Sequence, residues 1–271
     1  MDSSEESILC VKEGNIATIV LNKPQKLNAV TRKELQRITT LLHEIADDKN
    51  IFITVITGSG RFFSAGLDVG AIDPTLQQER GDILGDFVKN NFSISQAFYR
   101  HPKILVGALN GPVVGLPAAL VGFCDFVYAT PHTFLLTPFS SLGLVTEGVA
   151  SMCLVARMGI SKANEALIMS RKIPCDELVS TGFVNKVFSG KDQKDSTGFL
   201  NQVKAEIEDK LGHHLNRESL LRIKSLIRRP SLDALDAQNI CESMEGTGRF
   251  LQGAPQEEFR RIASGEKRHK L

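Results

Sequence analysis

Two short glycine-containing segments have the residue types that stabilise a developing negative charge. The first, RFFSAGLD, runs from Arg61 to Asp68, and the second, NGPVVGLP, runs from Asn110 to Pro117. Small residues let a ligand approach the backbone closely. Pro117 suits the first turn of a helix, so the amide of Leu116 is expected at a helix N-terminus, which favours negative charge. Two amides aimed at one point form an oxyanion hole. Such turns are also ordinary strand-to-helix connections, and the residues alone leave both interpretations open.

The remaining sequence predicts the elements that position these turns. Apolar runs of strand length predict strands at residues 16–21, 51–56, 104–109, 126–129, 134–136 and 183–188. Apolar spacing and the Thr31–Glu34 capping box predict helices from residue 31 and over about 83–99, 117–122, 148–158 and 162–170. From about residue 196 only helices are expected. This order predicts an α/β core with active site at 1–195, made of loosely repeated strand-strand-helix units. The helical region at 196–271 is expected to cover the core or to make subunit contacts.

The composition argues against several classes of function. The chain has 271 residues, 42% hydrophobic and 23% charged, with a net charge of +1, so no overall field attracts nucleic acid or an anionic membrane. No apolar run approaches the roughly 20 residues that span a bilayer. The acidic, polar N-terminus does not resemble a targeting peptide. The five cysteines are scattered and predict free thiols in a reducing compartment, and the six histidines form no cluster, so no metal is expected.

Four segments, taken in order, resemble the crotonase (enoyl-CoA hydratase/isomerase) superfamily. They are NKPQKLNA at 22–29, FFSAGLD at 62–68, NGPVVGLPAAL at 110–120 and FCDFVYA at 123–129. The resemblance implies a spiral of strand-strand-helix turns, an acyl-CoA substrate, and trimers or dimers of trimers. It also implies an oxyanion hole for the thioester carbonyl, formed by the amides of Leu67 and Leu116. The stretch Ala65, Gly66, Leu67, Asp68 and Val69 is then expected to line the substrate site.

The carboxylates indicate which reaction to expect. Hydratases of the family use two glutamates, and the matching positions here hold Ala119 and Phe139, so water addition by that pair is excluded. Glu147 lies in SLGLVTEG, which resembles the segment around the single catalytic glutamate of peroxisomal Δ3,Δ2-enoyl-CoA isomerases of the fungal type. One carboxylate that moves a proton from C2 to C4 suffices for that reaction, and burial beside Phe139, Leu142 and Leu144 is expected to raise its pKa.

Several alternatives stay open at this stage. Glu147 also suits the cap of a helix expected to start near Gly148. Asn91 matches an asparagine that some of these isomerases carry near the glutamate, but it also fits an exposed helix position. Dienoyl-CoA isomerases are the second candidate, although they carry a further acid where this chain has Phe139. A homologue that only binds acyl-CoA is the third.

The resemblance also bears on partners and compartment. No cofactor is expected besides the coenzyme A of the substrate. The final residues His269, Lys270 and Leu271 resemble the S-K-L signal and predict recognition by the peroxisomal import receptor and a place in the peroxisomal matrix. The basic residues of 222–229 are expected on a solvated helix face or against the CoA phosphates.

Overall fold

The computed structural model describes residues 6–68, 80–189 and 192–267, and side chains in the helix that begins at Arg80 from Lys89 onward. The strands are β1 (Ile8–Glu13), β2 (Ile16–Leu21), β3 (Ile53–Gly58), β4 (Ile104–Leu109), β5 (Val113–Val114), β6 (Phe126–Ala129), β7 (Phe134–Leu136), β8 (Ile173–Pro174) and β9 (Lys186–Val187). The α-helices are α2 (Arg32–Asp47), α3 (Arg80–Tyr99), α4 (Leu116–Leu120), α5 (Ala150–Leu167), α6 (Cys175–Ser180), α7 (Ser196–Leu211), α8 (Arg217–Arg228), α9 (Leu232–Leu251) and α10 (Ala254–Ala263).

The larger sheet has six strands in the order β1-β2-β3-β4-β6-β9. Only β1 and β2 pair antiparallel, and the other neighbours are parallel. β3 and β4 are buried along their whole length, because both faces of a parallel sheet are covered, and their sequences, ITVITG and ILVGAL, contain no charged residue. The predicted bounds of β2, β4 and β6 are confirmed. The expected α/β class is confirmed as well.

A smaller sheet, in the order β5-β7-β8, forms a second layer. Successive units place one strand in each sheet: β4 is followed by β5, and β6 by β7. This alternation produces the spiral of strand-strand-helix units. Isolated bridges from Ser64 to Val113 and from Leu67 to Val30 extend the second layer to both sides of the first glycine turn. The two turns singled out in the sequence therefore belong to one layer.

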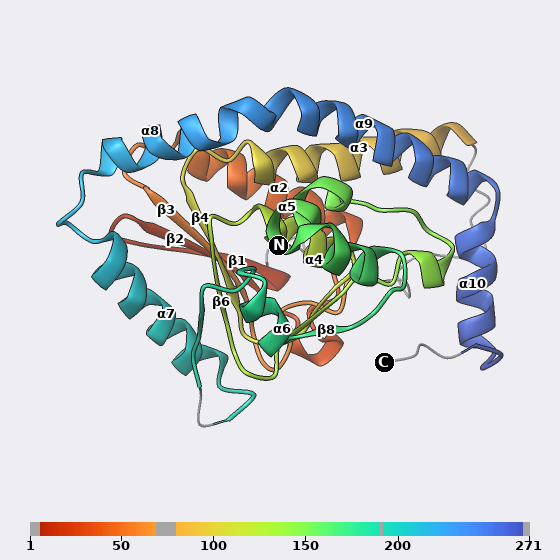
Figure 1. Cartoon of the computed structure of the whole chain (residues 1–271), viewed down its shortest axis with the longest axis horizontal. Coiled ribbons are helices and arrows are strands. Elements are labelled where there is room, and N and C mark those ends of the chain that lie inside the picture. Colours follow the sequence, from red (N-terminus) through yellow and green to blue (C-terminus); the bar gives the residue numbers. More distant parts are fainter. Residues whose placement is uncertain (1–5, 69–79, 190–191, 268–271) are drawn as a thin grey trace.

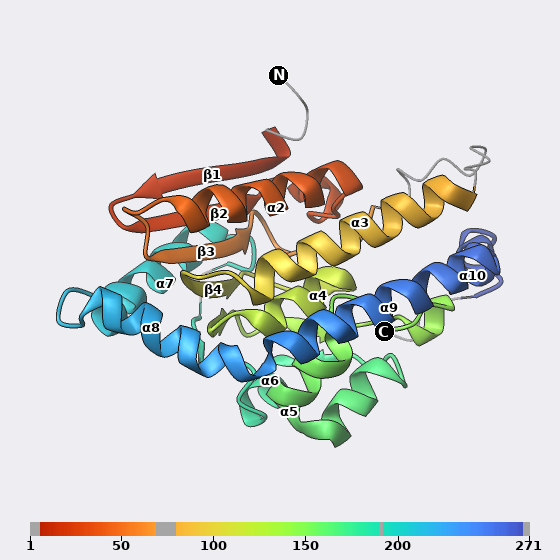
Figure 2. The ribbon, with the colours of Figure 1, turned by 90° about the horizontal axis from the view of Figure 1, so that it is seen from above.

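Three helices lie side by side against the sheets, with α3 between α2 and α9 (Figure 2). α2 begins at the predicted capping box: the Thr31 hydroxyl accepts a hydrogen bond from the Glu34 amide, and the Glu34 carboxylate accepts one from the Thr31 amide. α8 and α9 run along one edge of the molecule and α10 turns down at its end (Figure 1). From Ser196 to Ala263 the regular elements are all helices, as expected.

One predicted strand needs correction. The strand expected at 183–188 is reduced to Lys186–Val187, because Phe183 and Val184 are buried in the core without pairing in the sheet. Burial alone accounts for that apolar run. The two helices expected at 148–158 and 162–170 are confirmed as the two helical stretches of α5, which are separated by a non-helical break at Gly159 with φ of 75° and ψ of 158°. β1, β5, β8 and α6 were not predicted, since short edge elements carry little periodicity.

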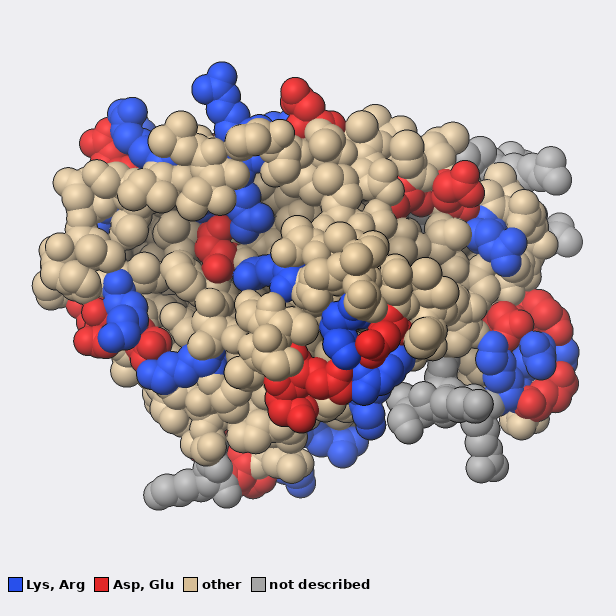
Figure 3. All heavy atoms as spheres, in the orientation of Figure 1, with Lys and Arg blue, Asp and Glu red and all other residues tan. Residues whose placement is uncertain are grey.

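On the face drawn in Figure 3, acidic and basic side chains are interspersed over the coloured residues, in keeping with the net charge of +1. Within the described ranges, no helix is both long enough and apolar enough to cross a bilayer. In the same ranges no group of three or more His, Cys, Asp or Glu side chains is arranged to hold a metal ion.

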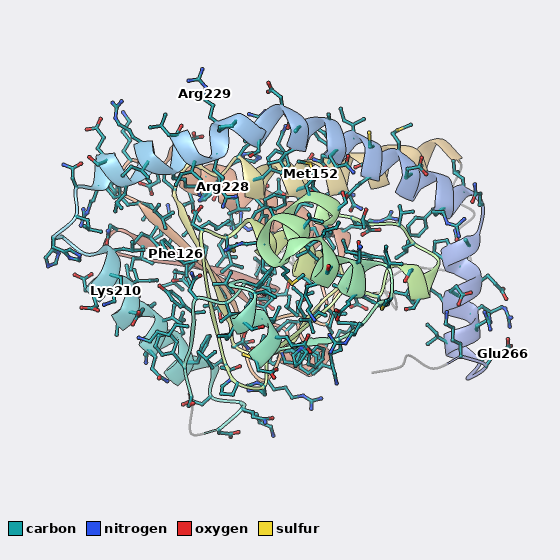
Figure 4. The ribbon with its side chains drawn as sticks, viewed as in Figure 1. Phe126, Met152, Lys210, Arg228, Arg229 and Glu266 are labelled. Atoms are coloured by element: carbon teal, nitrogen blue, oxygen red, sulfur yellow. The ribbon has the colours of Figure 1, made fainter. Side chains whose placement is uncertain are left out.

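The basic stretch of α8 is divided between the interior and the solvent. Lys224 is buried and forms an ion pair with Asp125 at 2.6 Å, and Arg228 pairs with the other oxygen of Asp125 at 2.9 Å. Arg229 points away from the molecule, whereas Arg228 lies on the inner side of α8 (Figure 4). The expected solvated face is therefore wrong for Lys224 and Arg228, which hold α8 against the core.

Candidate active site

The two glycine turns run parallel and are hydrogen-bonded to each other. The amide of Phe63 donates to the carbonyl of Pro112 at 3.0 Å, and the amide of Val114 donates to the carbonyl of Ser64 at 2.9 Å. The bridge pairs Ser64 with Val113. Leu67 and Leu116 each follow this bridge by three residues. The sequence predicted two amide donors for one anion, and the bridge brings the two segments that carry them together.

Backbone pairing leaves both of these amides out of the ladder. In the bridge to Val30, the pairing groups are the Gly66 carbonyl and the Asp68 amide, so the Leu67 amide faces the other way. Leu116 is the first residue of α4, and the first amides of a helix have no partner within the helix. Among the described residues, neither amide has a backbone acceptor, and both residues line the same cavity.

Glycine is required at the residue before each amide. Gly66 has φ of 98° and Gly115 has φ of 67° with ψ of −137°, conformations that a side chain strongly disfavours. The turns are also in contact, because a Cβ built on Gly115 would lie 3.7 Å from the Cα of Gly66. The two glycines therefore set both the direction of the amides and the closeness of the turns.

The cavity in front of the amides has a volume of about 390 Å³. Its walls are largely apolar and come from the turns, from the segment before α5 and from the C-terminal helices; they include Phe62, Leu136, Phe139, Leu142 and Leu144. The polar side chains in the described lining are those of Arg32, Asn90, Asn91 and Glu147. An apolar cavity with few polar groups is typical of a site for a small organic substrate.

Glu147 is the one carboxylate in the described lining of this cavity. The pKa of Glu147 is raised to about 7. Burial is the largest cause, and the negative charge of Glu242 is the second. Phe139, Leu142 and Leu144 line the cavity with it, as expected from the sequence. Glu147 does not cap α5, since the helix begins at Ala150 and its N-cap residue Val149 makes no side-chain cap. A carboxylate with a pKa near neutrality is suited to take up and return a proton.

Asn91 lies beside Glu147 in the lining of the cavity. It is only 9% exposed, so the exposed helix position considered from the sequence is wrong. Its side chain donates a hydrogen bond to Glu147, which lowers the pKa of that carboxylate. Asn90 beside it accepts a hydrogen bond from the side chain of Gln36 at 2.8 Å. Asn91 is therefore placed to orient the carboxylate, and Asn90 is held by α2.

The expected substrate-binding stretch is divided. Ala65, Gly66 and Leu67 line the cavity. Asp68 does not belong to the described lining, and its carboxylate pairs with Lys26 at 3.1 Å and with Lys23 at 3.8 Å. Val69 lies outside the described residues.

Sequence reasoning missed the residues that close the cavity from the C-terminal helices. Phe250 comes from α9, and Phe259 and Ile262 come from α10. Arg32, at the start of α2, also lines the cavity. The amphipathic pattern of α10 shows that one of its faces is covered, but it does not show that this face meets the site.

Comparisons with known proteins identify relatives of this chain. The family model "Enoyl-CoA hydratase/isomerase" matches residues 11–211. A Delta(3,5)-Delta(2,4)-dienoyl-CoA isomerase of Pyricularia oryzae is 54% identical and aligns with 95% of this chain and 96% of its own length. A 3,2-trans-enoyl-CoA isomerase of Saccharomyces cerevisiae is 33% identical, with coverage of 96% and 95%. The structure of an enoyl-CoA hydratase/isomerase from Pseudoalteromonas atlantica matches with a TM-score of 0.83 at 23% identity, covering 98% of this chain and 100% of that one.

Proposed function

Because this chain belongs to the enoyl-CoA hydratase/isomerase family, we propose that it is an isomerase that converts a 3-enoyl-CoA into the 2-trans-enoyl-CoA. Two relatives that bear isomerase names support the assignment of this chain as an enoyl-CoA isomerase. The observation that carries the finer proposal is the lone carboxylate of Glu147 in the described lining of an apolar cavity, with its pKa raised to about 7.

The proposed reaction begins with proton transfer to this carboxylate. Glu147 takes a proton from C2 of the 3-enoyl thioester, and the electron pair of that C–H bond moves into a dienolate. The amides of Leu67 and Leu116 donate hydrogen bonds to the thioester oxygen as its negative charge develops. Protonated Glu147 then returns the proton to C4, and the double bond is left between C2 and C3. The proton balance closes on one side chain, so the reaction consumes no cofactor.

Water addition is disfavoured by the neighbouring side chains. Hydration needs a second group to activate or protonate water, and the two positions that carry glutamates in hydratases hold Ala119 and Phe139. Ala119 is fully buried. It packs against the segment that carries Glu147, since a Cβ built on Gly148 would lie 2.9 Å from the Cβ of Ala119. Phe139 contributes an apolar wall of the cavity. An acid-base pair of the hydratase kind has no place at these two positions.

A second candidate is the isomerisation of 3,5-dienoyl-CoA to 2,4-dienoyl-CoA. The observation that favours it is the 54% identity to a relative that bears this name. That reaction returns the proton to C6, farther from the thioester than C4. Phe139 stands where the family's dienoyl isomerases carry their further acid, so a single carboxylate would have to serve both carbons.

A parallel assay on the two substrates tests these proposals. Purified protein is given a 3-enoyl-CoA or a 3,5-dienoyl-CoA, and the conjugated product is followed by absorbance. The Glu147→Gln variant serves as the base-free control, with binding of a saturated acyl-CoA measured by calorimetry. We expect conversion of the 3-enoyl thioester, lost by roughly 100- to 10,000-fold in the variant with binding retained. Conversion of the dienoyl substrate alone would establish the second candidate. Binding without conversion of either would leave an acyl-CoA-binding role.

Assembly and compartment are proposals as well. A homotrimer or homohexamer is supported by exposed large apolar side chains on α8 and α9, namely Ile223, Leu226, Ile227, Ile240 and Met244. Light scattering of the purified protein checks this. The peroxisomal proposal rests on His269, Lys270 and Leu271, which lie outside the described residues. A fluorescent protein ending in these residues should collect in peroxisomes, and removal of Leu271 should release it to the cytosol.

A further inference from the structure

Glu242, on α9, is a buried carboxylate directly behind the candidate base. It is 5% exposed and does not belong to the described lining of the cavity. α9 packs along α3, and Asn239 fixes this contact by donating a hydrogen bond to the carbonyl of Phe92 at 3.0 Å. Glu242 therefore approaches Glu147 through the protein interior rather than through the substrate cavity.

The contacts of Glu242 are concentrated on the segment that follows Glu147. One oxygen of its carboxylate accepts hydrogen bonds from the Ser151 amide at 3.1 Å and the Ser151 hydroxyl at 2.5 Å. The side chain of Gln238 donates to the same hydroxyl at 2.9 Å. Burial raises the pKa of Glu242, and the contacts with Ser151, the Thr146 side chain and the Val149 backbone lower it by less than burial raises it.

These contacts replace a cap that α5 does not make for itself. The first amides of a helix need acceptors, and the N-cap residue Val149 offers no side-chain acceptor. Glu242 supplies that acceptor from another helix by binding the Ser151 amide. A carboxylate at the N-terminus of a helix is also favoured by the helix dipole. The start of α5, and with it the preceding turn, is thus fixed by α9.

The turn between Glu147 and α5 needs such support. Gly148 has φ of 70° and Val149 has φ of 57°, so two successive residues are left-handed. A β-branched side chain strongly disfavours this conformation, and Val149 is fully buried while adopting it. The surrounding contacts must therefore hold the turn in place, and those of Glu242 lie on both sides of Val149.

Glu242 also places a negative charge beside the base. Two groups act on the pKa of Glu147 apart from burial: Glu242 from α9, which raises it, and Asn91 from α3, which lowers it. Arg32 from α2 lines the same cavity, and Cys153 from α5 lies near enough to Glu242 for that charge to raise the thiol pKa. Glu242 is thus the one acidic group, among the described residues, that acts on the base from behind.

We propose that Glu242 is a positioning residue for the isomerisation, which fixes the turn carrying Glu147 and keeps a negative charge behind it. The inference rests on the proposed function, because it assigns to Glu242 an effect on the same proton transfer. Glu242 itself touches neither the cavity nor the substrate, and it acts through Glu147.

Two substitutions separate the two parts of this role. Glu242→Gln keeps an acceptor for Ser151 and removes the charge, whereas Glu242→Met removes both. The matched control is Glu245→Gln, the same change at an exposed position of the same helix. The measurement is the pH dependence of kcat/KM, whose acid limb reports the base of the free enzyme. We expect the limb to move down by about half a pH unit or more in both Glu242 variants and to stay in place in the control. The plateau should fall further in Glu242→Met than in Glu242→Gln.

An unmoved limb in Glu242→Gln, or equal movement in Glu245→Gln, would overturn the proposal, since a purely structural role changes the plateau alone. A titration that needs no turnover covers the case in which the variants do not fold or no activity is found. Carboxyl 13C NMR of the wild type and of Glu147→Gln should show Glu242 titrating at lower pH in the variant, because coupling between two sites is reciprocal. An unchanged Glu242 titration would refute the coupling even if the isomerase assignment failed independently.

Discussion

The side chain of Asn91 on α3 donates a hydrogen bond to the carboxylate of Glu147, on the segment before α5. This contact favours the ionised carboxylate, while burial and the charge of Glu242 favour the protonated form. The pKa of Glu147, on the segment before α5, is therefore lowered by a residue of α3 and raised by a residue of α9. The pKa of this base therefore depends on how α3 and α9 pack around it, and substitutions in either helix can change it.

The wild-type enzyme should lose activity as the solution becomes acidic. Only ionised Glu147 can accept the C2 proton, and its pKa is about 7. We expect kcat/KM for a 3-enoyl-CoA to fall about tenfold per pH unit below that value. Rates measured between pH 5 and pH 9 check this. A profile that stays flat down to pH 5 would mean that the base has an ordinary carboxylate pKa.

Removing the hydrogen-bond donor Asn91 should move the acid limb of the pH–rate profile to higher pH. In Asn91→Ala the ionised form of Glu147 loses its partner, so its pKa rises and the acid limb shifts to higher pH. Asn90→Ala is the matched control, because Asn90 is the adjacent residue and bonds to Gln36 instead. Its limb should stay where it is in the wild type. Equal shifts in the two variants would show that Asn91 has no specific contact with the base.

The ionisation of Glu147 should also lower the stability of the protein as pH rises, whereas it raises the activity. A raised pKa means that the native state keeps a proton that the unfolded chain has lost, so stability falls as pH rises from about 4 to about 7. Glu147→Gln removes this loss. At pH 8 the variant should be the more stable by up to about 3 kcal/mol, and at pH 4 the difference should vanish. Urea unfolding at several pH values measures this, and a difference independent of pH would contradict it.

Gly115→Ala tests the direction of the Leu116 amide. Because Gly115 has φ of 67° and ψ of −137°, alanine there forces the backbone to move. We expect kcat/KM to fall by about 100- to 1000-fold, as when one oxyanion donor is lost. Gly14→Ala is the control, since Gly14 also has positive φ, has no neighbour near a Cβ and lies in the β1–β2 turn. It should lower stability by about 1 kcal/mol and leave the rate unchanged. A small effect on the rate in Gly115→Ala would argue against the role of the Leu116 amide.

Lys224→Met should destabilise the fold. The substitution removes the closest cation from the largely buried Asp125 carboxylate, which keeps Arg228, and breaking a buried pair costs up to about 3–5 kcal/mol. Arg222→Met removes an exposed pair with Glu218 and should cost less than about 1 kcal/mol. Chemical denaturation compares the two. Similar losses would show that the position of α8 does not depend on the buried pair.

The parts of this molecule that the sequence predicts are those that local physics determines. The capping box of Thr31 and Glu34 involves residues three apart, and the buried strand Ile104–Leu109 is an apolar run of its own length. Each of the two glycine turns is recognised from a motif of its own, at 61–68 and at 110–117. Each of these features is settled within one or two turns of chain, so the pattern of residue types is sufficient.

The parts that were missed depend on packing between distant segments. Lys224 is a residue type that usually lies on a solvated helix face, yet it is buried because it pairs with Asp125. Glu242 and Phe250 sit on α9 among ordinary helix residues, and only the contact of α9 with α3 brings them to the site. No spacing within α9 records where that contact falls. The buried position of Asn91 was hidden for the same reason.

The closure of the cavity by α9 and α10 has a consequence for synthesis of the polypeptide. The pairing of β1, β2, β3 and β4 involves no residue beyond Leu109, so a nascent chain of that length already holds four of the six strands of the larger sheet. Glu147 follows soon afterwards, but Glu242, Phe250 and Phe259 emerge from the ribosome at least 95 residues after Glu147. Until then the base lacks its apolar cover and the charge behind it. A truncated product can therefore resemble the finished protein in its sheet while remaining unable to perform the chemistry.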